Sequence, residues 1–404
     1  MKKLVHLLIG DPKKVFTPFN VITGFIMVVG LALIGLRLVK GLGAVTNLTQ
    51  TTPWGLWIGF DVMSGVALAA GGYTLAATVH LFGLKQYEPL VRPAILTGFL
   101  GYVFVVLGLI LDLGRPWRMP FIMIFPRGVT SVLFEVGMCV AAYLTVQLLE
   151  FVPAFWEWLQ WDGLRRIWGK LTVWLSILGV VLSTLHQSSL GSLFLLAPTK
   201  LYPLWYSPYL PLFFFVSSII AGLSMVIVES SLSHRLFAYR LSPTAHFDLD
   251  TLTLGLAKAA AVVLYVYFFL KLIGLSELGR WDLLNAPYGY VYLVEMLGFV
   301  ALPCILYTIG VRTGNVKLVR FTGGWTVIGI IFNRLNVSII AFNWQLSPHY
   351  YPSWMEITVS VTLVTMGIWL FRWLVNRLPV MSDEKPETGT NTLKDLWATG
   401  AEGA

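Results

Sequence analysis

The stretch Leu182–Phe194 reads Leu-Ser-Thr-Leu-His-Gln-Ser-Ser-Leu-Gly-Ser-Leu-Phe and closes a long apolar run that begins near Ile167. Four consecutive polar side chains, from His186 to Ser189, lie in the middle of this stretch. A polar group in the hydrocarbon core of a membrane is costly unless it finds a partner, so such groups are rare and often functional. Histidine also titrates near neutral pH. We therefore interpret this stretch as one wall of a membrane site that handles protons.

The composition of the whole chain indicates a multi-pass membrane protein. Its 404 residues are 57% hydrophobic and only 12% charged, whereas a soluble domain is about 25% charged. The formal net charge is +8, but the basic residues punctuate apolar runs, which favours a positive-inside membrane topology over nucleic-acid binding. The two cysteines, Cys139 and Cys304, support no disulfide framework, iron–sulfur cluster or covalently attached haem.

The apolar runs predict an all-α integral membrane fold, because about 20 apolar residues cross a bilayer as a helix. We expect about ten spans, with spans two to five (54–190) and six to nine (209–343) forming two four-helix bundles. The expected spans are residues 18–39, 54–80, 94–112, 129–151, 168–190, 209–232, 252–274, 289–311, 321–343 and 353–375. Residues 1–17 would form an N-terminal segment before the ten-span domain 18–375, and residues 376–404 a polar, disordered tail. The first run has no small-residue cleavage site, so we interpret it as a retained span.

The distribution of Lys and Arg predicts the orientation of the chain. Most of them fall in the segments that share a side with the N-terminus, and fewer, among them Arg37 and Lys271, fall in segments on the opposite side. This bias places both termini in the cytoplasm. The tryptophans Trp54, Trp57, Trp117, Trp205, Trp281, Trp344 and Trp354 then lie at outer helix ends, where aromatic belts are expected.

Spans two to five each contribute one titratable side chain in the outer half of the membrane. Asp61 lies about 12 Å below the outer start of its span at 1.5 Å per residue. Asp112 ends the third span, Glu135 follows the start of the fourth, and His186 precedes the end of the fifth. These depths predict a polar pocket that opens towards the outer face. For any one of these residues, a structural role in a helix contact is as well supported as a functional one. For the set as a whole, we favour a functional role.

A second set of charged residues lies in spans six to nine. Glu229 and Lys258 are expected towards the inner face, and Glu295 and Arg334 towards the outer half. The matched polar content of the two groups of spans suggests a duplicated bundle, although no clear repeat is visible at the residue level. The staggered depths of Glu229, Lys258 and Glu295 motivate the hypothesis of a proton path through the second bundle.

We expect neither haem nor a bound metal in this chain. A membrane b-haem needs two facing histidines at similar depth, but His80 falls at the inner end of span two and His186 near the outer end of span five. No two His or Cys residues have the spacing of metal ligands.

A quinone suits the Trp-lined polar pocket that remains. Its ring is flat and apolar, its carbonyl oxygens accept hydrogen bonds, and its two-electron reduction takes up two protons. We expect His186 to donate to one carbonyl, with Asp61 or Asp112 as its orienting partner. Trp54 and Trp57 are better explained as interfacial anchors than as ring-stacking residues.

Five blocks of sequence resemble a known family. They are Pro-Trp-Gly-Leu-Trp-Ile-Gly-Phe-Asp at 53–61, Tyr-x-Pro-Leu-Val-Arg-Pro-Ala at 87–94, Asp-Leu-Gly-Arg-Pro-Trp at 112–117, Ser-Val-Leu-Phe-Glu at 131–135 and His-Gln-Ser-Ser-Leu-Gly-Ser-Leu at 186–193. Over nearly its whole length the chain is similar to the NrfD (polysulfide-reductase) family of membrane subunits. It most resembles the ten-span HybB-type subunits of nickel–iron hydrogenases, and DsrP- and QrcD-type subunits are similar.

The resemblance implies a multi-pass subunit of the prokaryotic cytoplasmic membrane that carries no redox cofactor of its own. It implies a ferredoxin-like iron–sulfur subunit docked on the outer face, a catalytic partner subunit, and electron exchange with menaquinone or ubiquinone in the first bundle. The polar pocket so implied consists of Asp61, Asp112, Glu135 and His186, with Arg334 from the second bundle, and we expect the first four of these residues to be catalytic. The quinone-binding set that we expect is Trp54, Trp57, Asp61, Arg115, His186, Gln187, Ser188 and Arg334.

Three functions remain open from the sequence. The leading one is the quinone-reactive subunit of a respiratory oxidoreductase, of hydrogenase or sulfur-metabolism type, coupled or not to proton translocation. A proton-coupled transporter would also contain buried charges, but transporter sites lie near the middle of the membrane. A passive membrane anchor would need no quinone at all.

Overall fold

The structure, a computed structural model, describes residues 17–125, 128–237, 248–347, 349–378 and 380–381. Ten helices within these ranges are long and apolar enough to cross a membrane. Within these ranges, β pairing is limited to a single bridge between Leu201 and Phe342. The predicted all-α class with about ten spans is therefore confirmed. The predicted terminal segments 1–17 and 376–404 lie almost wholly outside the described residues.

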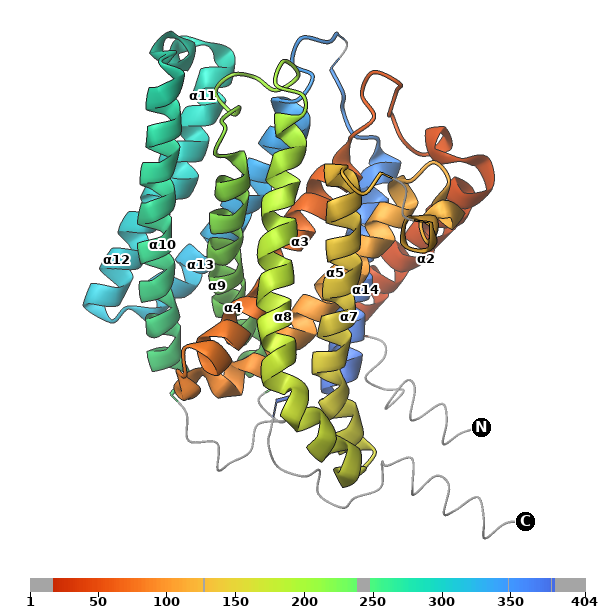
Figure 1. Cartoon of the computed structure of the whole chain (residues 1–404), viewed down its shortest axis with the longest axis vertical. Helices are drawn as coiled ribbons and strands as arrows, with labels where there is room; N and C mark the ends of the chain where they lie inside the picture. The colour runs from red at the N-terminus through yellow and green to blue at the C-terminus, as the bar shows by residue number, and fades with distance from the viewer. Residues whose placement is uncertain (1–16, 126–127, 238–247, 348, 379, 382–404) are drawn as a thin grey trace.

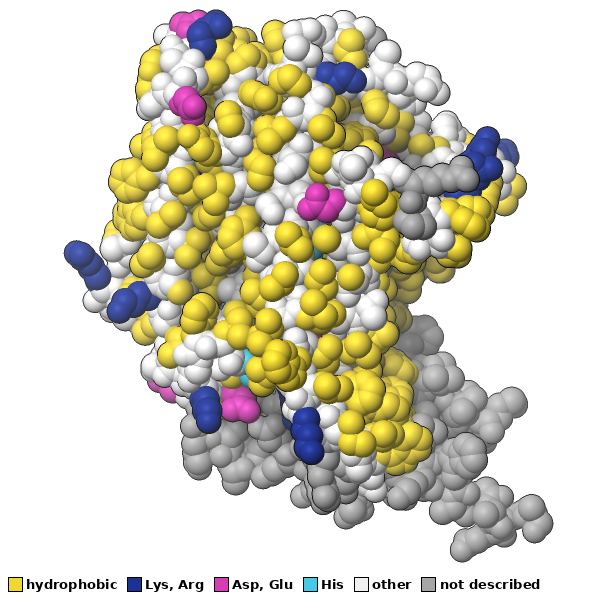
Figure 2. All heavy atoms as spheres, viewed as in Figure 1, with side chains coloured by type: hydrophobic (Ala, Val, Ile, Leu, Met, Phe, Trp, Pro, Cys, Tyr) yellow, Lys and Arg dark blue, Asp and Glu magenta, His cyan; other side chains and the backbone are white. Residues whose placement is uncertain are grey.

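The membrane helices run side by side, with their connections at two ends (Figure 1). Hydrophobic side chains cover much of the visible surface between these ends (Figure 2). The ten spans are α2 (Pro18–Lys40); η3, α3, α4 and η4 (Trp57–Ser64, Gly65–Leu68, Gly71–Ala76, Ala77–Leu81); η5 with α5 (Lys85–Tyr87, Glu88–Asp112); α7 (Val132–Trp158); α8 (Asp162–Leu195); α9 (Leu210–Leu236); α10 (Leu249–Leu278); α11, η9 and α12 (Pro287–Leu293, Val294–Ala301, Leu302–Thr313); α13 and η10 (Val316–Leu335, Asn336–Ile340); and α14 (Trp354–Val375). The short helices η2 (Leu42–Ala44), η6 (Pro116–Arg118), α6 (Phe121–Ile124) and η8 (Trp281–Asn285) lie in connections. We call the end with connections 41–56, 113–131, 196–209, 279–286 and 341–353 the upper end, and the opposite end the lower end, after Figure 1.

Local sequence specifies several helix ends. Ser353 and Glu356 form a capping box at the start of α14, in which each side chain satisfies a backbone N–H that the helix leaves unpaired. The helices α10 and α12 end at Gly279 and Gly314, whose φ angles are 66° and 63°. Glycine adopts this left-handed conformation without the steric cost of a Cβ.

Helix α9 lies at the centre of the packing. It contacts α8, α10 and α13 as well as α3 and α4, so it joins the two predicted bundles. The first and last membrane helices, α2 and α14, pack on each other, and α14 also packs on α5 and η3. The division into bundles at 54–190 and 209–343 stays a prediction, because α9 has neighbours on both sides.

The second span is broken near its middle, where the sequence predicted one continuous helix from 54 to 80. The Ala70 N–H bonds to the Ala67 carbonyl at 3.3 Å, so the Val66 carbonyl loses the partner that an α-helix would supply. Gln187 of α8 satisfies it instead, with its Nε2 at 2.9 Å. A Cβ added to Gly222 of α9 would lie 2.9 Å from the backbone of Ala70. The break is therefore closely packed against both neighbouring helices.

Two basic residues that the orientation argument counted on the outer side are buried inside their helices. Arg37 of α2 is 2% exposed and Lys271 of α10 is 5% exposed. A buried cation needs a partner, and both have one in the site described next. Counting them as topology signals was wrong for this reason.

Candidate functional site

An aromatic cavity of about 190 Å³ lies at the upper end. Its walls include Trp54, Tyr288, Phe342, Asn343 and Tyr350. Trp54 stacks on Phe342, with ring centroids 5.1 Å apart and an interplanar angle of 16°. Within the predicted quinone-binding set, Trp54 is the residue that lines this cavity. We call this space the upper cavity.

A buried carboxylate lies directly behind the wall of the upper cavity. The Tyr350 phenol donates to the Glu356 carboxylate, whose other oxygen accepts the Asn47 N–H at 2.7 Å. Burial, together with the negative charge of Glu356, raises the pKa of Tyr350. The Tyr350 side chain therefore stays a phenol over the physiological pH range. The predicted residue Trp57 also lies behind this wall, where its Nε1 donates to the Glu356 carbonyl oxygen at 3.1 Å.

Asp61 lies beside Ser360, which is one helical turn of α14 below Glu356. The Ser360 hydroxyl donates to Asp61 Oδ2 at 2.6 Å. A Cβ on Gly108 of α5 would be 2.9 Å from the Asp61 Cβ, so this glycine allows the close approach of α5. The π-helical turn η3 holds Asp61, which is 8% exposed.

Asp112 belongs to the same acidic cluster. It lies within electrostatic range of Arg37 and Glu356, and Asp61 lies within range of Asp112. Arg37 donates to the Leu111 carbonyl oxygen at 2.6 Å, which fixes the end of α5 to α2. Asp112 Oδ1 is buried without a hydrogen-bond partner among the described residues. The structure thus brings the two predicted aspartates together.

Sequence reasoning missed the companions of these aspartates. Glu356, Ser360 and Arg37 come from the two flanking helices, which the expected bundles left out. The capping pattern Ser353-x-x-Glu356 was visible in the sequence and marks a helix start. It gave no sign that this carboxylate would also bind a tyrosine of the preceding loop.

His186 is fully buried and has different partners from those predicted. Its Nδ1–H donates to the Leu182 carbonyl oxygen at 2.7 Å, because a carbonyl can only accept. Its Nε2 then accepts the Tyr102 hydroxyl proton, and the Tyr143 ring lies 5.2 Å from the imidazole. Asp61 and Asp112 are therefore not its orienting partners. No N–H of a neutral His186 remains free to donate to a quinone carbonyl in this arrangement.

The neighbours of His186 on α8 serve the helix backbone. Gln187 donates to Val66 as described, and Ser188 Oγ donates to the Thr184 carbonyl oxygen at 2.7 Å. Ser189 Oγ donates to Glu135 Oε1 at 2.5 Å, and Glu135 is exposed on α7. The predicted residue Arg115 is exposed in the connection after α5.

The second bundle holds a buried charge network. Glu295 accepts from Asn333 and Asn336 at 2.7 Å each and from Trp205 Nε1 at 2.9 Å. Lys271 Nζ lies 3.5 Å from the same carboxylate. Arg334 stacks 3.9 Å above the Phe214 ring. Glu295 is thus the centre of a structural network, and its cation is Lys271.

Among the described residues, no hydrogen bond or ion pair joins the three members of the predicted proton path. Glu229 accepts from Ser233 at 3.0 Å and lines a cavity of about 10 Å³ beside the break of span two, enough for one water. Lys258 is exposed on α10, and Glu295 lies near the upper end. This path stays a prediction.

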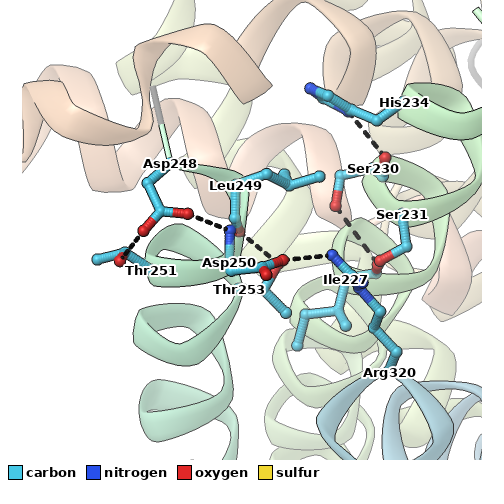
Figure 3. A network of polar contacts seen from close by, with 10 residues as sticks. All are labelled: Ile227, Ser230, Ser231, His234, Asp248, Leu249, Asp250, Thr251, Thr253 and Arg320. Carbon is cyan, nitrogen blue, oxygen red and sulfur yellow. Dashed lines mark hydrogen bonds and ion pairs between the residues drawn. The ribbon is translucent and has the colours of Figure 1, made fainter. Parts of the chain in front are cut away.

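The lower ends of α9, α10 and α13 are held by a separate polar network (Figure 3). Arg320 of α13 bonds to Asp250 at the start of α10, with an N···O distance of 2.7 Å. His234 Nδ1 donates to the Ser230 carbonyl oxygen at 2.8 Å. These bonds hold helix ends together and lie away from the predicted site.

The absence of haem stays a prediction, and it rests on the different depths of His80 and His186. His80 bonds through Nδ1 to Ser176 Oγ at 2.9 Å, near the lower end, whereas both ring nitrogens of His186 are already bonded in the upper half. No group of three His, Cys, Asp or Glu side chains suited to a metal occurs in the part of the chain that the structure describes.

Comparison with known proteins gives the family. The family model described as polysulphide reductase, NrfD, matches residues 44–344. The chain is 34% identical over 379 residues, covering 93% of each chain, to a "probable Ni/Fe-hydrogenase 2 b-type cytochrome subunit" of Escherichia coli. It is 25% identical over 378 residues, covering 86% of this chain and 87% of the other, to a "menaquinone reductase, integral membrane subunit" of Nitratidesulfovibrio vulgaris.

A further protein of Nitratidesulfovibrio vulgaris is 53% identical over 371 residues, which cover 91% of this chain and 96% of that protein. The relatives thus align across almost all ten spans, and they include membrane subunits of hydrogenase and reductase complexes. The chain belongs to the NrfD family of membrane subunits.

Proposed function

We propose that the chain is the quinone-reactive membrane subunit of a multi-subunit respiratory oxidoreductase of a prokaryotic cytoplasmic membrane. It would exchange electrons between an iron–sulfur subunit docked at the upper end and the menaquinone or ubiquinone pool. The relative named a menaquinone reductase membrane subunit supports the choice of quinone. The orientation that we infer places the upper end outside and both termini in the cytoplasm.

The observation that carries this proposal is the upper cavity. Its volume of about 190 Å³ lies below the range of about 300–1,000 Å³ for whole-ligand sites, so it suits a ring head group whose tail extends outward. Trp54 and Phe342 supply apolar walls, and the polar side chains of Tyr288, Asn343 and Tyr350 also line the cavity. The cavity lies at the end where a partner would dock, so electrons would reach the ring without a redox group in this chain.

A line of polar groups connects the upper cavity with the predicted catalytic aspartates. It runs from the Tyr350 phenol to Glu356, then one turn along α14 to Ser360, and from Ser360 to Asp61. We infer that Asp61 and Asp112 exchange protons with the quinone oxygens through this line. The His186–Tyr102 pair and Glu135 form a second group on α5, α7 and α8, to which we assign proton transfer.

The test is quinone binding by the purified complex with two cavity variants. Trp54→Ala removes an apolar wall, and Tyr350→Phe removes the phenol while leaving Glu356 in place. We expect Trp54→Ala to raise the Kd or KM for a short-chain quinone up to about ten-fold, because an aromatic contact contributes about 0.5–1.5 kcal/mol. Tyr350→Phe removes the donor to the buried Glu356 carboxylate, and we expect the disturbed cavity wall to raise the Kd or KM as well. Trp117→Ala, a change at an exposed upper-end tryptophan outside the cavity, is the matched control. Unchanged quinone affinity in both cavity variants would move the site elsewhere.

The two alternatives make different predictions for the same samples. A passive anchor would retain no quinone after purification and would show full complex activity after His186→Ala and Asp61→Asn. A proton-coupled transporter would catalyse solute uptake in vesicles without its partner subunits. The placement of the upper cavity at one end of the spans favours neither a mid-membrane transport site nor an inert anchor.

A further inference from the structure

The connection between α5 and α7 exposes large apolar side chains in close succession. Its short helices η6 and α6 hold Trp117, Phe121 and Ile124, which are 68%, 52% and 64% exposed, and Phe125 after α6 is 57% exposed. A contiguous apolar patch of this kind marks an interaction site, whereas single exposed apolar residues are ordinary. We call residues 115–125 the α6 segment. It takes no part in lining the upper cavity.

Contact with α7 fixes the depth of the α6 segment. A Cβ built on Gly137 would lie 3.2 Å from Ile122 Cδ1, so Ile122 packs against α7 at this glycine. Gly137 comes five residues after the helix start at Val132, which is about 7.5 Å along the axis at 1.5 Å per residue. The α6 segment therefore lies beside a membrane helix and not above its end.

The length of α7 indicates which layer of the membrane surrounds this contact. Its 27 residues make a helix about 40 Å long. The hydrocarbon core of a bilayer is about 30 Å thick, and the bilayer with its headgroup layers is about 40–45 Å thick. A centred α7 thus extends about 5 Å beyond the core at each end. Gly137 and the α6 segment then lie at the boundary between headgroups and acyl chains.

Two arginines give the α6 segment a positive charge. Arg115 and Arg118 are exposed, and neither forms an ion pair with another described residue. The sequence from residue 113 to residue 134 contains no Asp or Glu. Glu135, the next acid along the chain, accepts a hydrogen bond from Ser189. Basic side chains next to apolar ones are typical of segments that lie in a membrane interface and bind anionic headgroups.

The depth of the α6 segment favours phospholipid over a protein partner as the surface that covers it. A subunit docked at the upper end contacts connections that extend past the helix ends, whereas the α6 segment lies along the side of α7. We propose that the α6 segment lies in the interface of the upper leaflet and binds anionic phospholipid. Its apolar side chains contact the acyl chains, and its two arginines bind phosphate, which a guanidinium recognises by paired hydrogen bonds as well as by charge. This inference is independent of the quinone function.

The experiment places a fluorescent probe on the α6 segment in the whole complex. Met123 of α6 is 46% exposed, so Met123→Cys accepts an NBD label in a background where Cys139 and Cys304 are replaced by alanine. The complex is reconstituted in nanodiscs of phosphatidylcholine and phosphatidylglycerol. The quenchers are a lipid with a doxyl group on its acyl chain and aqueous iodide. We expect loss of fluorescence with the doxyl lipid and little loss with iodide, because the probe lies among acyl chains.

Selectivity for headgroup charge is measured with the same probe. Doxyl-labelled phosphatidylglycerol should quench it more strongly than doxyl-labelled phosphatidylcholine at the same mole fraction. Arg118→Gln, alone and together with Arg115→Gln, should remove this excess. Each change should lower the local affinity for the anionic lipid about five-fold, because one basic residue near the surface contributes about 1 kcal/mol.

Two other positions supply the controls. Lys200 lies exposed in an upper connection, so the probe on Lys200→Cys should be quenched by iodide and not by the lipid. Val262 lies in the middle of α10 and is 59% exposed. The two doxyl lipids should therefore quench the probe on Val262→Cys equally, since no arginine of the α6 segment is near it.

Quenching of the Met123→Cys probe by iodide alone would place the α6 segment in water and overturn the proposal. Protection from both quenchers would show that a protein surface covers the segment, which would overturn it as well. Equal quenching by the two doxyl lipids would rule out recognition of the anionic headgroup. Each of these results leaves quinone binding at the upper cavity as it stands.

Discussion

At the scale of single residues, tertiary contacts decide whether a charged side chain is buried or exposed, even where the local sequence looks alike. Lys258 and Lys271 both lie in α10, thirteen positions apart, and look alike in sequence. Lys258 is exposed, whereas Lys271 is 5% exposed and lies 3.5 Å from Glu295. Only the helix face that each residue presents to the core separates a surface lysine from a buried ion pair.

Lys271→Met should destabilise the protein strongly, and Lys258→Met should not. Removing one partner of a buried ion pair costs about 3–5 kcal/mol because the other charge stays buried, and the amide donors to Glu295 place the expected loss near the lower limit. An exposed lysine should change stability by about 0.5 kcal/mol or less. Thermal unfolding of both variants in the same detergent measures the difference. Equal unfolding temperatures would show that Glu295 does not need the Lys271 charge.

At the scale of elements, small residues determine how closely the helices pack at the break of span two. The sequence Ala69-Ala70-Gly71-Gly72 has no side chain larger than a methyl group, so neighbouring backbones approach. Gly222 of α9 is part of this contact, since an added Cβ would lie 2.9 Å from both the Ala70 carbonyl carbon and the Gly71 nitrogen. Backbone atoms cannot rotate away as a side chain can.

Gly222→Ala should therefore lower the free energy of unfolding by about 1–3 kcal/mol, the usual cost of overpacking. Gly324→Ala in the middle of α13, where a Cβ meets nothing within 4 Å, should raise it by up to about 1 kcal/mol, because alanine is the better helix former. Denaturant titration in micelles reports both. A stabilising Gly222→Ala would mean that α9 does not press on the break.

At the scale of the whole molecule, the basic residues predict an orientation in the membrane, and labelling tests this prediction. Lys200 lies exposed at the upper end and Lys317 at the lower end. In a background without Cys139 and Cys304, we expect a cysteine in place of Lys200 to react with an impermeant maleimide from outside the cell. The Lys317→Cys variant should react only after the membrane is opened. The reverse pattern would invert the topology and place the upper cavity in the cytoplasm.

The sequence by itself determined the fold class, the family and most span positions, since long apolar runs and short motifs are local properties. It also identified Asp61 and Asp112, which the structure brings into one acidic cluster.

Tertiary structure alone decided the partners. His186 pairs with Tyr102, Asp61 with Ser360, and Glu295 with Lys271, each across a helix contact that no spacing in the chain encodes. Depth along a helix can be counted from its ends, but the face that a residue presents to its neighbours depends on how helices pack and where one of them breaks.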